Sequence, residues 1–517
     1  MSTAAQSLAK DGPFGRHDAC WIFPYGLLVV TGVVLACWLR ASGFPCPRGD
    51  DSIYKSPAAE LVQHGRLAVP CSIGFLPQAE SVFACYPPIY QLLLSAWYLM
   101  FGVSLYSSLA FTYTVHLVNV LAVAETTRRL LEPCAELSGR ARKLIVLAVG
   151  LIHLGNLAYF DRQEEAALLF VWAEVLLAAG WPARRGVLPS VASGVLVGLA
   201  GLTSPWVGVL GAMIVALRFG LTAAQESRPH TFAIWGKAGL RLGVVAVIGA
   251  TLAGTWYAVV EMLYPGAIRD QFFGTLGFLK DTQGSLALGD RLGVFLNTLF
   301  YNPPQLPASL MALILFPVVV AGRGWRRVAP LGLALYGAGV LGVVAVAALR
   351  PIAYTYLGAA QMVLLPCLGP AAARYFGGGR SSARIGIAAL VLCAVVAWKD
   401  VALCGLSTWR LPAAERPDAV FDRLTALIPP GEAVAVTSRH WHAFQGRNPW
   451  REAYFSSLLD AREVRRCKWL VLAPGLGTPG FIDAFELVEQ RPARGDPSRT
   501  YAYSLWRRRP QDSPSAR

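Results

Sequence analysis

The chain has 517 residues, of which 55% are hydrophobic and 15% are charged, and its formal net charge is +15. Soluble globular domains carry about 25% charged residues, so this composition excludes an ordinary soluble protein. A strongly basic chain can bind nucleic acid, but here the positive charge is confined to short joints between apolar runs long enough to cross a bilayer. We therefore predict a polytopic membrane protein whose partners include membrane lipid and exclude nucleic acid.

About eleven apolar runs are predicted to cross the membrane as helices, since a helix needs roughly 20 apolar residues to span a bilayer. In chain order they are residues 21–40, 105–127, 144–160, 166–181, 187–203, 205–221, 242–263, 305–322, 329–349, 351–372 and 383–404. A further apolar segment, 87–102, is predicted to lie along the outer membrane interface, because counting it as a span would reverse the sidedness of every later joint.

The joints between these runs alternate between basic and weakly charged. The basic set comprises Arg128, Arg129, Arg140, Arg142, Lys143, Arg184, Arg185, Arg218, Arg228, Lys237, Arg241, Arg323, Arg326, Arg327, Arg374, Arg380 and Arg384. Cytoplasmic joints are enriched in Lys and Arg, so we place this set and the N-terminus in the cytoplasm. Residues 41–104, called the first loop, and 160–165, called the second loop, are then outside. The predicted location is the inner (plasma) membrane of a bacterium.

Residues 405–517, called the tail, differ in composition from the membrane module, residues 1–404. Charged residues alternate there with short β-type runs at 433–436, 469–472 and 501–506. A helical stretch at 418–428 precedes the first run and ends at Pro429-Pro430-Gly431. This pattern predicts a small extracytoplasmic α/β domain of about 100 residues.

Two structural pairings are suggested by polar residues near and within the spans. The first loop holds Cys46, Cys71 and Cys85, and one disulfide among them is an open alternative in an oxidising compartment. His153 and Glu174 fall on the third and fourth predicted spans. Because these spans are antiparallel neighbours and a buried charge needs a partner, we expect the two side chains to pair.

Two acidic clusters are predicted to lie on the outer face. Asp50 and Asp51 stand in the first loop, and Asp161 and Glu164 stand in the second loop. Carboxylates beside lipid are costly unless they find partners or a wet cavity. A positioned carboxylate can also take a proton from an acceptor hydroxyl as a general base. The clusters are therefore candidates for one catalytic site, with a solvated loop as the alternative for each.

Several short motifs surround these clusters. Gly49-Asp50-Asp51 is followed by Ala58-Ala59-Glu60-Leu61 and Gly65, Tyr86-Pro87-Pro88-Ile89-Tyr90 is followed by Phe101-Gly102-Val103-Ser104, and the second loop holds Arg162-Gln163-Glu164. Over about residues 20–220 the chain resembles GT-C glycosyltransferases. The closest type is family 39, which includes protein O-mannosyltransferases and the aminoarabinose transferases of lipid A. That family usually has Asp-Glu where this chain has Asp50-Asp51, which makes a base or metal role for the second position less secure.

The resemblance implies an inverting glycosyltransferase with a GT-C-like membrane fold, acting on the outer face. The donor is then a hexosyl or pentosyl group on a polyprenyl phosphate, and the acceptor is a hydroxyl of a lipid, glycan or protein in the cell envelope. Asp50 would be the base, with Asp51, Asp161 and Glu164 completing the acidic site. The resemblance requires no cofactor; it allows a divalent metal but assigns no ligands to it.

Cations on the outer face are expected to hold the leaving phosphate by charge-assisted hydrogen bonds. The residues predicted to bind substrate are Lys55, His64, Arg66, Tyr86, Arg162, Arg269 and Arg350. For each cation taken alone, a solvated or snorkelling side chain is the alternative.

A transporter or flippase of lipid-linked sugar is the rival prediction from another class of protein. Such a protein is expected to have broken spans, inverted repeats and charged residues at the midplane. In this sequence the acidic clusters lie in loops instead, and Glu174 is the one clear acid within a predicted span. This distribution favours the enzyme.

Overall fold

The computed structural model describes residues 21–44, 46–47, 51–73, 76–134, 137–158, 162–180, 187–226, 232–273, 289–290, 293–296, 306–349, 354–377, 380–453, 461–474, 482–493 and 500–510. Its principal helices are α1 (Ile22–Arg40), α2 (Asp51–His64), α3 (Ile89–Phe101), α4 (Leu105–Leu131), α5 (Gly139–Leu154), α6 (Gln163–Gly180), α7 (Leu188–Gly201), α8 (Pro205–Glu226), α9 (Phe232–Leu263), α12 (Leu306–Arg323), α13 (Pro330–Leu349), α14 (Tyr354–Leu364), α15 (Leu368–Gly377), α16 (Arg380–Trp409), α17 (Pro417–Leu427) and α19 (Ala461–Arg466). Most of them coincide with the apolar runs, because a helix satisfies its own backbone hydrogen bonds in lipid.

Eight helical segments of the described residues are long and apolar enough to cross a membrane. They are α1, α4, α8, α9, α12, α13, α16 and the continuous α14–α15 segment. The predicted spans at 144–160, 166–181 and 187–203 correspond to α5, α6 and α7, which are shorter or more polar than these eight. An integral helical membrane protein is thus confirmed, while the total of eleven spans stays a prediction.

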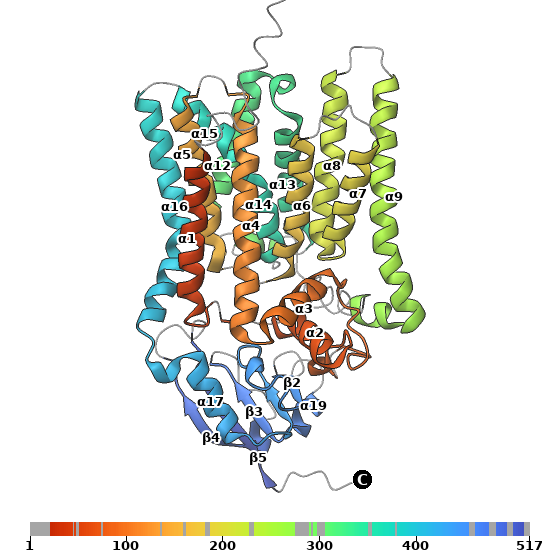
Figure 1. Cartoon of the computed structure of the whole chain (residues 1–517), viewed down its shortest axis with the longest axis vertical. Helices are drawn as coiled ribbons and strands as arrows, with labels where there is room; N and C mark the ends of the chain where they lie inside the picture. Colours follow the sequence, from red (N-terminus) through yellow and green to blue (C-terminus); the bar gives the residue numbers. More distant parts are fainter. Residues whose placement is uncertain are drawn as a thin grey trace, which may run out of the picture.

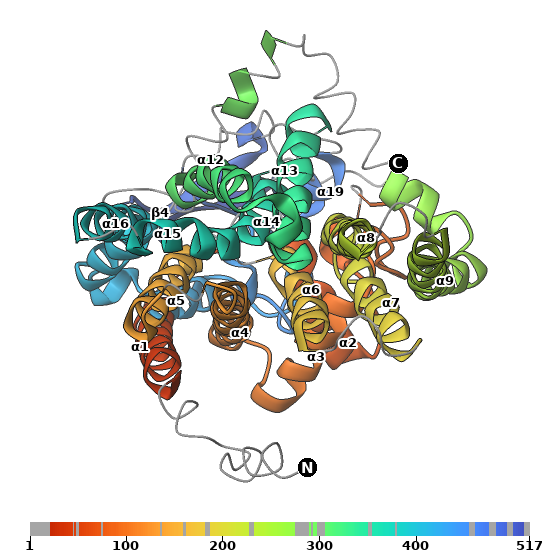
Figure 2. The same cartoon turned by 90° about the horizontal axis from the view of Figure 1, so that it is seen from above.

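The membrane helices stand side by side, with α2, α3 and the tail gathered at one end of the layer (Figure 1). Seen from above, α4 lies between α5 and α6 (Figure 2). The chain therefore enters α4 from the end that holds the first loop, and α6 begins at Gln163, within the predicted second loop. This arrangement brings the two loops to the same end of the molecule.

The apolar segment 87–102 forms α3, which lies beside α2 below the membrane helices (Figure 1). Tyr90, Leu94 and Tyr98 are buried at every fourth position and so form one face of the helix. Ser95 of this face donates a hydrogen bond to the carbonyl of Ala58 in α2 at 3.1 Å. α3 is not one of the eight helical segments long enough to cross the membrane. Its contact with a membrane surface stays a prediction.

The tail contains a five-stranded sheet with strand order β2-β1-β3-β5-β4. The strands are β1 (Val434–Val436), β2 (Trp450–Glu452), β3 (Trp469–Leu472), β4 (Phe485–Arg491) and β5 (Tyr503–Arg508). β1 is parallel to β2 and β3, whereas β5 is antiparallel to β3 and β4. The predicted small α/β domain is confirmed, and its edge strands β2 and β4 are the two that the sequence pattern missed.

The tail packs directly on the first loop through buried polar contacts. The hydroxyls of Ser52 and Ser438 lie 2.8 Å apart, and Tyr501 donates a hydrogen bond to the carbonyl of Gly43 at 2.6 Å. Buried polar groups are retained only where they find partners, so these contacts fix the sheet against the start of α2. Cys46, Cys71 and Cys85 are all buried nearby, and the disulfide left open among them is not formed.

Candidate active site

The first turn of α2 carries a buried ion pair. The carboxylate of Asp51 lies 3.0 Å from the ammonium of Lys55, and their side chains are 6% and 2% exposed. Asp51 suits a helix N-terminus, where a negative charge meets the positive end of the helix dipole. Lys55, one turn later, supplies the opposite charge that a buried carboxylate requires. Two of the predicted site residues are therefore paired with each other on one face of α2.

The second loop reaches α2 through Arg162. Its Nη2 donates a hydrogen bond to the hydroxyl of Tyr54 at 2.6 Å, and its guanidinium carbon lies 4.6 Å from the centroid of the Tyr54 ring. The Tyr54 hydroxyl in turn donates to the hydroxyl of Tyr86 at 3.1 Å. Burial raises the pKa of Tyr86 well above its ordinary range, so this phenol keeps its proton. Three segments that are distant in sequence thus meet at one polar junction.

Glu164 lies beside this junction at the start of α6. Its side chain is 1% exposed, and one carboxylate oxygen is 3.8 Å from Nε of Arg162. The next residue, Glu165, accepts a hydrogen bond from His116 of α4, and its backbone carbonyl accepts one from Asn119 at 2.9 Å. These contacts hold the first turn of α6 against α4 and so fix the position from which Arg162 extends.

The expected pairing of His153 with Glu174 is wrong. The ring of His153 lies against that of His116, with centroids 5.1 Å apart. Glu174 instead accepts hydrogen bonds from Arg218 of α8 at 2.8 Å and from Ser193 of α7 at 3.1 Å. A buried carboxylate is compensated better by a permanent cation than by an imidazole, and the sequence pattern did not reveal that α8 reaches α6.

His64 and Arg66 do not join the junction at Tyr54. His64 is the last residue of α2, roughly 20 Å from Asp51 at about 1.5 Å rise per residue, and Arg66 follows two positions later. His64 Nδ1 and Arg66 Nε lie 3.0 and 3.5 Å from one carboxylate oxygen of Glu60. They line a separate pocket, to which the tail also contributes.

Arg269 is likewise held apart, in an exposed ion pair with Asp270 at 2.9 Å. Its neighbour Gln271, which no sequence motif singles out, is fully buried. The Gln271 amide accepts hydrogen bonds from the backbone N–H groups of Ala84 and Cys85 and donates to the carbonyls of Pro77 and Val82. It therefore orders the stretch of the first loop that leads into Tyr86.

Three predicted site residues, Asp50, Asp161 and Arg350, lie outside the described residues. Within the described ranges, no three His, Cys, Asp or Glu side chains come together as a metal site would require. Among the described residues, the ion pair of Asp51 with Lys55 and the ion pair of Glu164 with Arg162 each set one carboxylate against one cation. In the sequence, Asp50 directly precedes Asp51 and Asp161 directly precedes Arg162.

No family model and no curated protein matches the sequence. Solved structures do match: ArnT from Cupriavidus metallidurans bound to undecaprenyl phosphate aligns with a TM-score of 0.60 at 15% identity, covering 93% of this chain and 97% of that chain. The apo state of the same protein gives a TM-score of 0.57 at 14% identity over the same shares of both chains. This likeness extends through the membrane helices and the tail, and it confirms that the chain has the GT-C fold.

Proposed function

We propose that the protein is a membrane glycosyltransferase that moves a sugar from a polyprenyl phosphate to an acceptor hydroxyl, with inversion, on the outer face of the membrane. The fold shared with an ArnT that binds undecaprenyl phosphate supports this class of donor. The observation that carries the proposal is the contact of Arg162 with Tyr54 and of Tyr54 with Tyr86. It gathers the residues of three loop motifs at the N-terminal end of α2.

In this proposal Asp50 is the base toward the acceptor hydroxyl. Asp50 directly precedes Asp51, the first residue of α2, and Asp51 already neutralises the buried Lys55. A carboxylate committed to a buried ammonium is a poor proton acceptor, because protonating it would leave the ammonium uncompensated. The neighbouring Asp50 is therefore the better candidate, and Asp51 serves to hold Lys55.

Lys55 and Arg162 are the cations proposed to meet the leaving phosphate. Lys55 is held by the carboxylate of Asp51. Arg162 is held by the carboxylate of Glu164 and by the hydroxyl of Tyr54. Phosphate oxygens are strong acceptors for such donors, and the planar guanidinium can bind two of them at once. Glu164, beside Arg162, would orient that guanidinium. Negative charge that develops on the leaving phosphate would thus meet preorganised donors.

The test is a transfer assay with purified protein reconstituted in lipid, using a polyprenyl phosphate that carries a radiolabelled sugar. Release of polyprenyl phosphate with transfer of label to an acceptor is expected, and Asp50→Asn should abolish most of it. The matched control is Arg423→Gln, which alters an exposed ion pair with Glu489 in the tail. If the intact donor moved between leaflets and was not consumed, the protein would be a transporter of lipid-linked sugar and this proposal would be wrong.

A further inference from the structure

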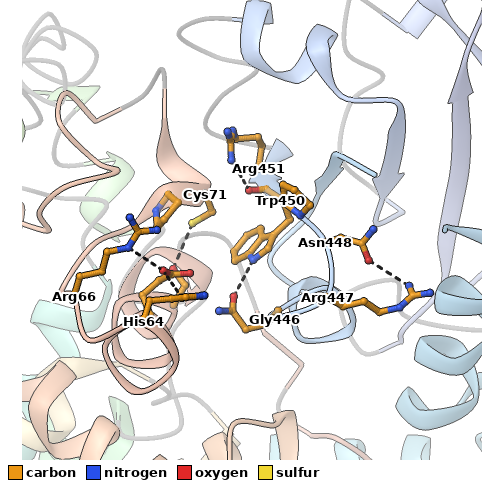
Figure 3. Close-up of a pocket in the computed structure, with 13 residues that line it drawn as sticks. His64, Arg66, Cys71, Gly446, Arg447, Asn448, Trp450 and Arg451 are labelled. Atoms are coloured by element: carbon orange, nitrogen blue, oxygen red, sulfur yellow. Dashed lines mark hydrogen bonds and ion pairs between the residues drawn. The ribbon is translucent and has the colours of Figure 1, made fainter. Parts of the chain in front are cut away.

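A pocket lies on the side of α2 that points away from the Tyr54 junction. It has a volume of about 380 Å³ and is lined by α2, the start of the following segment and residues 445–451 of the tail (Figure 3). Ser56, Glu60 and His64 line it at four-residue spacing. At 3.6 residues per turn this row points roughly opposite to Tyr54. The pocket is therefore separated from the proposed reaction site by the thickness of one helix.

The pocket carries an excess of positive charge. Arg66, Arg447 and Arg451 line it together with a single carboxylate, that of Glu60. Arg66 uses only Nε toward Glu60, its side chain is 52% exposed, and among the described residues its two terminal nitrogens have no hydrogen-bond partner. Arg451 donates through Nη1 to the carbonyl of Trp450 at 3.1 Å, and its Nε lies 4.0 Å from a carboxylate oxygen of Glu463, which also pairs with Arg466. Donors on both walls are thus available to an anion.

Arg447 has a different part in this arrangement. Its guanidinium donates to the carbonyl of Thr425 at 2.7 Å and to Asn448 at 3.3 Å. Figure 3 shows it directed toward Asn448 rather than toward Arg66. It therefore adds positive potential while holding the tail segment in shape, and the groups that can contact a ligand directly are those of Arg66 and Arg451.

One wall of the pocket is a fixed aromatic ring. Trp450 is 7% exposed, its indole N–H donates to Gln445 at 2.8 Å, and its ring stacks on Trp441 with centroids 5.5 Å apart. A rigid apolar face combined with a few placed polar groups is typical of small-molecule sites, and such sites measure about 300–1,000 Å³. A ring-shaped ligand that bears an anionic group matches this combination of ring face and cations.

We propose that the pocket between α2 and residues 445–451 binds an anionic sugar, bearing either a phosphate or a carboxylate, and that in the proposed reaction this sugar belongs to the acceptor. The second part rests on the proposed function. A donor on a polyprenyl chain must stay beside the membrane helices, whereas this pocket is half built by the tail, beyond the layer of membrane helices (Figure 1). A polar acceptor group can reach it from solvent.

Binding of small probes to the full chain in neutral-lipid nanodiscs tests the pocket. Calorimetric titration would compare glucose 1-phosphate and glucuronate with methyl glucoside, which has the same ring without a charge. At least one anionic sugar should bind ten or more times as tightly as the neutral one, and the difference should shrink with salt. The two anionic probes decide between phosphate and carboxylate. Equal binding of the charged and neutral sugars would overturn the proposal.

Variants locate the binding and separate it from catalysis. Arg66→Gln and Arg451→Gln should each lower the affinity for the anionic probe about tenfold or more, which is the usual effect of losing one charge-assisted contact. Arg66→Lys keeps the charge and should retain most of the affinity, and Arg66 is exposed enough to be replaced without unfolding. Arg423→Gln is the matched control outside the pocket. Undiminished binding by folded Arg66→Gln and Arg451→Gln would contradict the site.

The probe measurement does not depend on turnover, so Asp50→Asn should bind the sugars like the wild type. If the wild type binds them but transfers no sugar, the proposed function and the acceptor assignment fail while the anion pocket stands. If it transfers sugar, Arg66→Gln should raise the KM for acceptor more than it lowers kcat. An unchanged acceptor KM in that variant would overturn the acceptor assignment.

Discussion

Arg162 donates a 2.6 Å hydrogen bond to the hydroxyl of Tyr54, a residue 108 positions earlier in the chain. Because Arg162 stands just before α6 and Tyr54 in the second turn of α2, this bond joins the second loop to the first. The same guanidinium lies over the Tyr54 ring and near Glu164. One side chain thereby fixes the relative position of the two acidic loops that the sequence places on one face.

Replacing Arg162 should impair transfer more than it impairs folding. Arg162→Gln removes the charge and the planar fork, and we expect turnover to fall about 100-fold, within the range for one electrostatic contact to a transition state. Arg162→Lys keeps a positive charge but not the planar guanidinium, and its turnover should be about tenfold lower than that of the wild type. The measurement is release of polyprenyl phosphate at saturating donor, with Arg423→Gln as control. Arg162→Gln with wild-type turnover would remove this residue from the site.

The Asp51–Lys55 pair predicts a specific pattern in a double-mutant cycle. Lys55→Met leaves a buried carboxylate without its ammonium and should destabilise the protein by about 3–5 kcal/mol. Adding Asp51→Asn removes the uncompensated charge and should recover much of that loss. Thermal unfolding in detergent measures the stability, and the transfer assay measures turnover. Strictly additive effects of the two substitutions would contradict a coupled pair.

Gln271 is predicted to be a positioning residue. Gln271→Ala would leave the buried N–H groups of Ala84 and Cys85 without their acceptor, and each such group costs about 1–3 kcal/mol. We expect a loss of stability of at least about 2 kcal/mol together with reduced turnover. Gln271→Glu keeps the acceptor but loses the donor to the carbonyls of Pro77 and Val82. Its stability and turnover should lie between those of the wild type and those of Gln271→Ala. Wild-type stability of Gln271→Ala would show that the loop is ordered by other contacts.

Two features of the fold and site could be predicted because they depend on local pattern. The helices follow apolar runs, and Arg162 and Glu164 stand two positions apart in one motif. The roles of Gln271 and Trp450 could not be predicted. Each role depends on contacts with segments that are distant in sequence and meet only in the folded chain. The edge strand β4 was missed for a related reason: Phe485 is its only buried residue, and the neighbouring apolar residues Leu487 and Val488 are both exposed, so the apolar alternation of a half-buried strand is absent.

The tail should lose stability as the pH falls below about 6.5, because of His440. Burial, aided by the nearby charge of Arg439, lowers the pKa of this imidazole to about 3 from an ordinary value of 6.5. Its Nε2 donates to the carbonyl of Tyr501 at 3.1 Å, as a neutral ring can. The unfolded chain binds a proton below pH 6.5 that the folded chain does not, so the stabilisation is complete above 6.5 and is lost as the pH falls toward 3.

At pH 5 this linkage amounts to about 2 kcal/mol relative to pH 7.5. Burial and then the charge of Lys55 lower the pKa of His442 well below its ordinary value in the same direction. Unfolding midpoints of the wild type, His440→Gln and the double variant with His442→Gln should therefore show a progressively smaller dependence on pH. An identical dependence in all three proteins would rule out these histidines as its source.

The proposed outer location of the site is tested by fusions to alkaline phosphatase, which is active only outside the cytoplasm. A fusion after Arg410, just beyond the end of α16, should be active. A fusion after Glu132, at the opposite end of α4, should be inactive. The carboxylates of Glu125 and Glu132 accompany Arg128 and Arg129 at that end, but topology follows the count of Lys and Arg and not the net charge.

The two fusions are informative only as a pair, because an inactive fusion can also be a degraded one. Each protein must therefore be detected at full length by immunoblot before its activity is compared. Since α2, α3 and the tail share one end of the helix layer (Figure 1), the fusion after Arg410 reports the side of the Arg162–Tyr54 junction as well. A stable but inactive fusion after Arg410, together with an active fusion after Glu132, would reverse the proposed orientation of the protein in the membrane. The site would then face the cytoplasm, and an acceptor in the outer cell envelope would be excluded.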